Sequence, residues 1–158
     1  MSSWRKSQKS VTSDQSEKQF ERKWLLLILF AVSFLVYSNT IGHRFAFDDS
    51  IVITENSYTK KGFEGIPELL SKDMFEGMYG EQLEVTGGRY RPLSLFVFAV
   101  MYEFFEDNPM PYHLLNVLVY CLLTMLVFQS VLMILNNSAL AFTTALLFAV
   151  HPIHTEVV

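Results

Sequence analysis

Two adjacent carboxylates, Asp48 and Asp49, are the first residues in the sequence whose types and spacing suit chemistry. Such a pair can bind a divalent cation, or one carboxylate can act as a general base while the other orients it. An acidic pair followed by Ser50 is also common in turns and helix caps. The spacing alone favours this structural role over the chemical one.

Two arginines, Arg89 and Arg91, form the second group, between a pair of glycines and Pro92. A guanidinium fork suits a phosphate group, and a helix that begins at Pro92 would add partial positive charge for an anion. The preceding glycines would let the backbone approach a ligand closely. The arginines could instead extend toward lipid head groups at a membrane surface, and the sequence leaves both interpretations open.

Histidines supply the remaining candidates. His113 shares a helix face with Asn116, and a hydrogen bond between helices is the simplest role for such a pair. His151, His154 and Glu156 lie within one short stretch. The spacing of the two imidazoles could serve a metal, but the stretch lacks the glutamate placement of a zinc-protease helix. We therefore expect no metal there, and instead proton handling or contact with a phosphate at a membrane surface.

Long apolar blocks must position these residues. Of the 158 residues, 51% are hydrophobic and 15% are aromatic, and the mean hydropathy of +0.26 is too high for a typical soluble domain. We predict an all-α membrane protein with about three transmembrane helices, at 24–41, 112–135 and 139–152. A net charge of −4 without a basic stripe gives no indication of nucleic-acid binding.

The first predicted helix, 24–41, carries no charge and nearly spans a hydrocarbon core of about 30 Å. A cleaved signal peptide is the alternative, but the run is long for one and no typical cleavage site follows it. Residues 1–23 are polar, contain more Lys and Arg than Asp and Glu, and predict a disordered or loosely helical tail. By the positive-inside rule this tail stays in the cytoplasm.

A polar segment, 42–111, follows and would face the outside, in the periplasm or the lumen. It is too long for a simple turn, and we expect partial order within it. Residues 92–105 predict a helix that is too short to span, so we expect it to lie in the membrane interface or against other spans. A full span is the alternative for this helix.

Two short polar segments flank the helix predicted at 112–135. Residues 108–111 contain two prolines and predict a helix break, while 136–138 predict a tight turn into an antiparallel helical hairpin. Residues 153–158 would then begin the next outer segment. This topology places all of the candidate residues on the outer face.

Taken in order, these motifs resemble the N-terminal part of the transmembrane and tetratricopeptide-repeat proteins. Those proteins belong to the GT-C class of glycosyltransferases, which includes protein O-mannosyltransferases. The resemblance covers roughly residues 24–158. The residues of these motifs are similar to those of a bacterial relative. It rests on Phe-Asp-Asp-Ser, Gly-Gly-Arg-Tyr-Arg-Pro-Leu-Ser, Pro-Tyr-His-Leu-Leu-Asn-Val-Leu and Leu-Leu-Phe-Ala-Val-His-Pro-Ile-His-Thr-Glu-Val-Val.

The resemblance implies a donor sugar linked to a polyprenyl phosphate and an acceptor hydroxyl on a protein Ser or Thr. Asp48 or Asp49 would draw the proton from the acceptor, and Arg89 and Arg91 would hold the lipid phosphate that leaves. The histidines and Glu156 would support this site. No cofactor is certain, and a divalent cation is possible.

Proteins of this family continue with many more spans and then helical repeats. The chain is therefore expected to be an N-terminal fragment, inactive by itself, of a bacterial inner-membrane enzyme whose partners are the bilayer, the lipid donor and a protein acceptor. A non-catalytic scaffold or assembly protein of the same ancestry is the alternative. The absence of charges within 24–41 and 112–135 argues against a transporter or channel.

Overall fold

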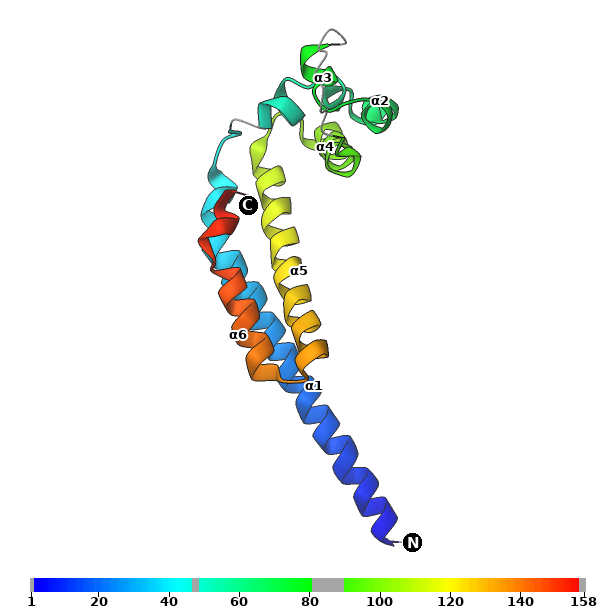
Figure 1. Ribbon diagram of the computed structural model, residues 1–158, viewed down its shortest axis with the longest axis vertical. Coiled ribbons are helices and arrows are strands. Elements are labelled where there is room, and N and C mark those ends of the chain that lie inside the picture. The colour runs from blue at the N-terminus through cyan, green and yellow to red at the C-terminus, as the bar shows by residue number, and fades with distance from the viewer. Residues whose placement is uncertain (1, 47–48, 81–89, 157–158) are drawn as a thin grey trace. The chain divides into compact units, whose positions relative to one another are not determined.

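The computed structural model describes residues 2–46, 49–80 and 90–156 (Figure 1). Throughout these ranges the regular elements are helices, which confirms the all-α class. The chain divides into two compact units, one formed by Met1–Asn39 with Asn116–Val158 and the other by Thr40–Leu115. We call them the helical unit and the loop unit.

The helical unit is built from long apolar helices. They are α1 (Ser2–Tyr37), most of α5 (Pro109–Leu135) and α6 (Ser138–Ala149), followed by the short helix η4 (Pro152–Glu156). Leu29 of α1 and Phe128 of α5 pack with Ala141 and Ala145 of α6 into a buried core. Because alanines four residues apart share a helix face, their small side chains let the α6 backbone lie close to its neighbours.

Two helical segments in the described part of the chain are long and apolar enough to cross a membrane, Phe20–Gly42 and Pro109–Leu135. They correspond to the first two predicted spans. The third, α6, has only 12 residues, fewer than the roughly 20 that a span usually needs. That it crosses the bilayer therefore stays a prediction.

The N-terminal region differs from the expected disordered or loosely helical tail, because α1 is continuous from Ser2 to Tyr37. This stretch contains neither Gly nor Pro and is rich in Lys, Gln and Glu, which favour helix. Extending the apolar helix backward also requires no new nucleation. The structure thus replaces a separate tail with the first part of one long helix.

The predicted helix break between 92–105 and 112–135 is present, since α4 (Pro92–Phe105) ends before it, but α5 already begins at Pro109. Amide groups in the first turn of a helix have no intrahelical acceptor, so proline is tolerated there. The side chain of Asn108 accepts a hydrogen bond from the Met110 N–H at 3.2 Å, as a helix cap does. The two prolines start the helix instead of separating it from a loop.

The tight turn between α5 and α6 forms as the sequence predicts. Asn136 adopts a left-handed backbone with φ of 49°, a conformation common just after a helix. Asn137 then caps α6 by accepting hydrogen bonds from the N–H groups of Ala139 and Leu140, at 3.0 and 3.1 Å.

The loop unit is a packed set of short helices. They are the end of η1 (Ser38–Gly42), η2 (Ser50–Thr54), η3 (Thr59–Gly65), α2 (Ile66–Ser71), α3 (Glu76–Tyr79) and α4 (Pro92–Phe105), followed by the first turns of α5. Leu69, Met74, Leu95 and Ala99 form its buried core, and α4 packs against η2, η3 and α2. The range of α4 is the range over which the sequence predicts a short helix. Its position in a membrane interface stays a prediction.

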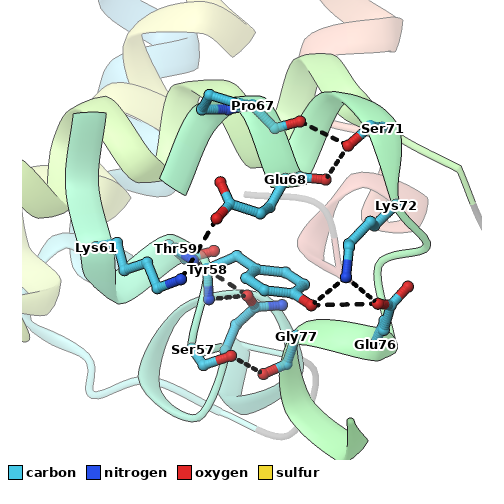
Figure 2. A network of polar contacts seen from close by, with 11 residues as sticks. Ser57, Tyr58, Thr59, Lys61, Pro67, Glu68, Ser71, Lys72, Glu76 and Gly77 are labelled. Carbon is cyan, nitrogen blue, oxygen red and sulfur yellow. Dashed lines mark hydrogen bonds and ion pairs between the residues drawn. The ribbon is translucent and has the colours of Figure 1, made fainter. Parts of the chain in front are cut away.

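A polar network holds the short helices of the loop unit together (Figure 2). The Lys72 ammonium contacts the Tyr58 hydroxyl at 3.1 Å and forms an ion pair with Glu76, and the Tyr58 hydroxyl donates to Glu76 at 3.2 Å. The ammonium of Lys61 lies 5.4 Å from the centroid of the Tyr58 ring and pairs with Glu68 at 3.4 Å. Both lysines therefore have acidic partners in the unit.

Candidate functional site

Asp49 is half-buried at the start of η2, whereas Asp48 lies outside the described residues. The Oδ2 atom of Asp49 accepts a hydrogen bond from the Ala46 N–H at 2.8 Å. In return, the Asp49 N–H donates to the Ala46 carbonyl at 2.8 Å. This reciprocal pair joins Asp49 to Ala46, while the Asp49 side chain makes no capping hydrogen bond to η2.

Arg91 is exposed immediately before α4, and Arg89 lies outside the described residues. The residue between them is anchored, because the Tyr90 hydroxyl donates to the Leu70 carbonyl at 2.5 Å. This bond ties the start of α4 to the end of α2. Among the described residues, no ion pair joins Arg91 to Asp49. The guanidinium therefore remains exposed beside a helix N-terminus.

His113 lies in the first turns of α5 among aromatic rings. Its ring centroid is 6.3 Å from that of Phe45, which also lies 5.3 Å from Tyr112 in an edge-on contact. The Nε2 atom of His113 is buried and has no hydrogen-bond partner among the described residues. The hydrogen bond between helices that the sequence predicts is therefore absent at Nε2 in this part of the chain.

The His151 and His154 side chains differ in their surroundings. His151 is exposed, and its Nδ1 atom accepts a hydrogen bond from the Ile153 N–H at 3.2 Å. His154 is half-buried, with its ring centroid 4.4 Å from Phe148 and 5.3 Å from Tyr120. The two imidazoles are 6.1 Å apart between centroids. One imidazole thus closes a turn and the other packs against aromatic rings.

Glu156 belongs to η4, but its side chain lies outside the described part. Within the described residues, no group of three or more His, Cys, Asp or Glu side chains is arranged to hold a metal ion.

Among the described residues outside the long apolar helices, Glu68 and Tyr102 have shifted pKa values. A hydrogen bond from its own backbone amide, supported by Lys61, lowers the pKa of Glu68. Burial raises the pKa of Tyr102, and Asp107 and Glu106 add to this effect. Neither group is a predicted site residue, so these shifts reflect the packing of the loop unit.

The candidate residues divide between the two units. Asp49, Arg91 and His113 belong to the loop unit, while His151 and His154 belong to the helical unit. The loop unit does pack η2, which follows Asp49, against α4, which follows Arg91.

Sequence reasoning missed two tyrosines that contact the His151 turn, Tyr37 and Tyr120. The Tyr37 hydroxyl donates to the His151 carbonyl at 3.3 Å, and the Tyr120 hydroxyl donates to the Phe148 carbonyl at 3.0 Å. The position of Tyr37 near the end of a predicted span indicates an interfacial aromatic residue, which is a weak sign of a special role. Tyr120 lies inside an apolar run, where nothing in the sequence distinguishes it.

Curated relatives are similar to this chain over most of its residues. A protein O-mannosyl-transferase of Caenorhabditis elegans is 30% identical over 138 residues, which are 84% of this chain and 19% of the relative. Protein O-mannosyl-transferase Tmtc1 of Drosophila melanogaster is 35% identical over 130 residues, or 81% of this chain and 15% of the relative. Protein O-mannosyl-transferases are homologues of this chain. Human protein O-mannosyl-transferase TMTC1 is 33% identical over 83% of the chain and 15% of its own length.

The homology supports the predicted resemblance to O-mannosyltransferases. The chain spans less than a fifth of the length of these relatives. No protein-family model and no solved structure matches it. The homologues together with the two long apolar helices support a membrane protein. The relatives named here are animal proteins, and the bacterial origin stays a prediction.

Proposed function

We propose that this chain is part of a membrane glycosyltransferase that transfers mannose from a polyprenyl-phosphate donor to a Ser or Thr hydroxyl of a protein. The observation that carries the proposal is the similarity to protein O-mannosyl-transferases over as much as 84% of the chain. The two long apolar helices support a position in the membrane. The cytoplasmic N-terminus and the outer position of the loop unit follow from the charge of residues 1–23.

In the proposed reaction, the acceptor oxygen attacks the anomeric carbon of the donor and forms the new glycosidic bond. The bond between that carbon and the phosphate oxygen breaks, and its electron pair leaves with the phosphate. A carboxylate takes the proton of the acceptor hydroxyl. The negative charge on the leaving phosphate is stabilised by guanidinium groups, for which Arg91 with Arg89 is the candidate pair.

The two carboxylates divide these tasks in our proposal. Because Oδ2 of Asp49 already accepts the Ala46 N–H, we assign Asp49 the structural task. Asp48 is then the general base, with a possible divalent cation shared by the pair. His113 is a supporting residue, since its buried Nε2 lacks a partner in the described part of the loop unit.

A non-catalytic scaffold of the same ancestry is the second candidate. The hydrogen bonds between Asp49 and Ala46 favour the scaffold, because they give this acid a structural task.

A chimeric enzyme tests the two candidates. Residues 24–156 would replace the matching segment of human TMTC1, and transfer of mannose to a protein acceptor would be measured in membranes. We expect transfer by the chimera and its loss in Asp48→Asn, whereas Asp49→Asn lowers both the activity and the amount of folded protein. A folded chimera without transfer, or full transfer in Asp48→Asn and Asp49→Asn alike, would favour the scaffold. A chelator arm would show whether a divalent cation takes part.

A further inference from the structure

Two buried tyrosines hold the chain where it leaves α6. The Tyr120 hydroxyl donates to the carbonyls of Phe148 and Ala149, at 3.0 and 3.2 Å. The Tyr37 hydroxyl donates to the carbonyl of His151 at 3.3 Å. The Phe148 and His151 carbonyls also accept the backbone N–H groups of His151 and His154, at 3.2 Å each, so the tyrosine hydroxyls add a second hydrogen bond to carbonyls at this end of the helix.

The two tyrosines also support each other. Their rings meet edge to face with centroids 4.8 Å apart, and each residue is at most 4% exposed. They come from α1 and α5, so three helices of the helical unit meet at the turn after α6 (Figure 1). Packing of this kind fixes rotamers and leaves the turn little freedom.

The turn favours one tautomer of the neutral His151 imidazole. Its Nδ1 atom accepts the Ile153 N–H at 3.2 Å, so Nδ1 carries no proton. In the neutral imidazole the proton is therefore on Nε2, which is a hydrogen-bond donor. Because His151 is exposed while His154 packs against Phe148, His151 is the member of the pair that can meet a ligand.

We propose that Tyr37 and Tyr120 are positioning residues that present the His151 Nε2–H as a donor to the phosphate of the lipid-linked substrate. The inference rests on the proposed function, which supplies the phosphate. An N–H aimed at a phosphate oxygen makes a charge-assisted hydrogen bond, which is stronger than a neutral one. A preset tautomer and turn reduce the ordering needed when the ligand binds.

The competing role for His151 is that of a turn residue only. Two substitutions separate the roles, because each amide replaces one ring nitrogen. His151→Asn keeps an acceptor near the place of Nδ1 and so preserves the bond to the Ile153 N–H. His151→Gln extends an N–H donor toward the place of Nε2 but loses the Nδ1 acceptor.

The binding test uses the whole chain in lipid nanodiscs, titrated with a short-chain polyprenyl phosphate. Loss of one charge-assisted hydrogen bond weakens binding by about 10- to 100-fold. We expect that loss in His151→Asn and a smaller loss in His151→Gln. The reverse order, or wild-type affinity in His151→Asn, would overturn the inference. A parallel titration with inorganic phosphate shows whether the site requires the lipid, and equal affinity for both would contradict a lipid-linked ligand.

The positioning role has its own readout in the ring nitrogens of His151, observed by NMR with ¹⁵N-labelled histidine. The wild type should show one protonated and one unprotonated nitrogen, and Tyr120→Phe should give an average of the two tautomers with weaker binding. Tyr112→Phe is the matched control, because it removes a hydroxyl from the same helix that donates to Glu106 instead. Unchanged nitrogen signals and affinity in Tyr120→Phe would contradict the positioning role.

The two proposals fail differently in these experiments. A wild-type chain that binds no polyprenyl phosphate would count against the donor assigned in the proposed function and against the ligand of His151. A wild type that binds, with His151→Asn binding equally well, would overturn only the role of His151.

Discussion

The buried amide of Asn56 lies directly against Gly77, and a Cβ at position 77 would collide with its side-chain oxygen. The amide nitrogen donates to the carbonyls of Ile51 and Met74, at 3.0 and 3.1 Å. The amide oxygen accepts the N–H groups of Tyr58 and Thr59, at 3.1 Å each. One side chain thus joins three segments of the loop unit.

Asn56→Ala should therefore destabilise the loop unit by about 2–3 kcal/mol, because buried backbone groups lose their partners. Hydrogen exchange of the Tyr58 and Thr59 amides in nanodiscs measures this effect, and both should exchange faster. Asn39→Ala, at an exposed position, is the control and should leave them unchanged. Equal protection in Asn56→Ala and the wild type would show that the amide is dispensable.

Three glycines of the loop unit should respond differently to alanine. Gly62 has φ of 58° and faces the Glu103 carboxylate, which accepts the Phe63 N–H at 3.1 Å. Gly80 has φ of 79° but open space, and Gly42 has open space without a positive φ.

Alanine should be tolerated best at Gly42, should cost about 1 kcal/mol at Gly80 from backbone strain, and should cost most at Gly62, where a collision is added. Resistance to proteolysis in nanodiscs ranks the three variants. A Gly62→Ala variant as resistant as Gly80→Ala would contradict the close approach of Glu103.

The alanine face of α6 should be intolerant of larger side chains. Ala145 is fully buried and packs in the same cluster as Leu29 of α1, so Ala145→Leu should destabilise the helical unit by about 1–3 kcal/mol. Ala139→Leu is the matched control, since Ala139 is exposed on the same helix. Thermal unfolding in detergent compares the two, and equal effects would mean that close packing of α6 is unimportant.

The two asparagines of the hairpin turn should behave differently. Asn136→Gly should change stability by only a few tenths of a kcal/mol or improve it, because glycine accepts the φ of 49° without strain. Asn137→Ala should cost about 1 kcal/mol through loss of the α6 cap. Thermal unfolding of both variants checks the order, and a greater loss in Asn136→Gly would contradict these assignments.

The helices could be predicted where local chemistry determines them. Pro92 marks the start of α4, and the uncharged run before Leu135 marks α5. The span predicted at 24–41 corresponds to Phe20–Gly42, but composition describes the preceding polar segment in isolation, whereas in the structure it continues the same helix, α1.

The contacts that define the candidate site could not be predicted in the same way. The Tyr37 hydroxyl and the His151 carbonyl are 114 residues apart in sequence, and no periodic pattern links them. In the sequence Asn56 is an ordinary loop asparagine, and only the structure shows that Gly77 packs against it. The acids could be recognised by residue type. The hydrogen bond between Asp49 and Ala46 depends on backbone geometry, which the spacing of the two residues in the sequence does not determine.

The shortness of α6 has a consequence for the depth at which its end lies in a bilayer. Its 12 residues measure about 18 Å at 1.5 Å per residue, against a hydrocarbon core of about 30 Å. A helix of this length that starts at one surface ends below the other, where water is scarce and bare carbonyls are costly. If α6 crosses the bilayer as predicted, the phenols of Tyr37 and Tyr120 supply hydrogen-bond donors there in place of water. A polar turn at that depth would meet a phosphate that stays attached to its lipid, without drawing that lipid out of the membrane.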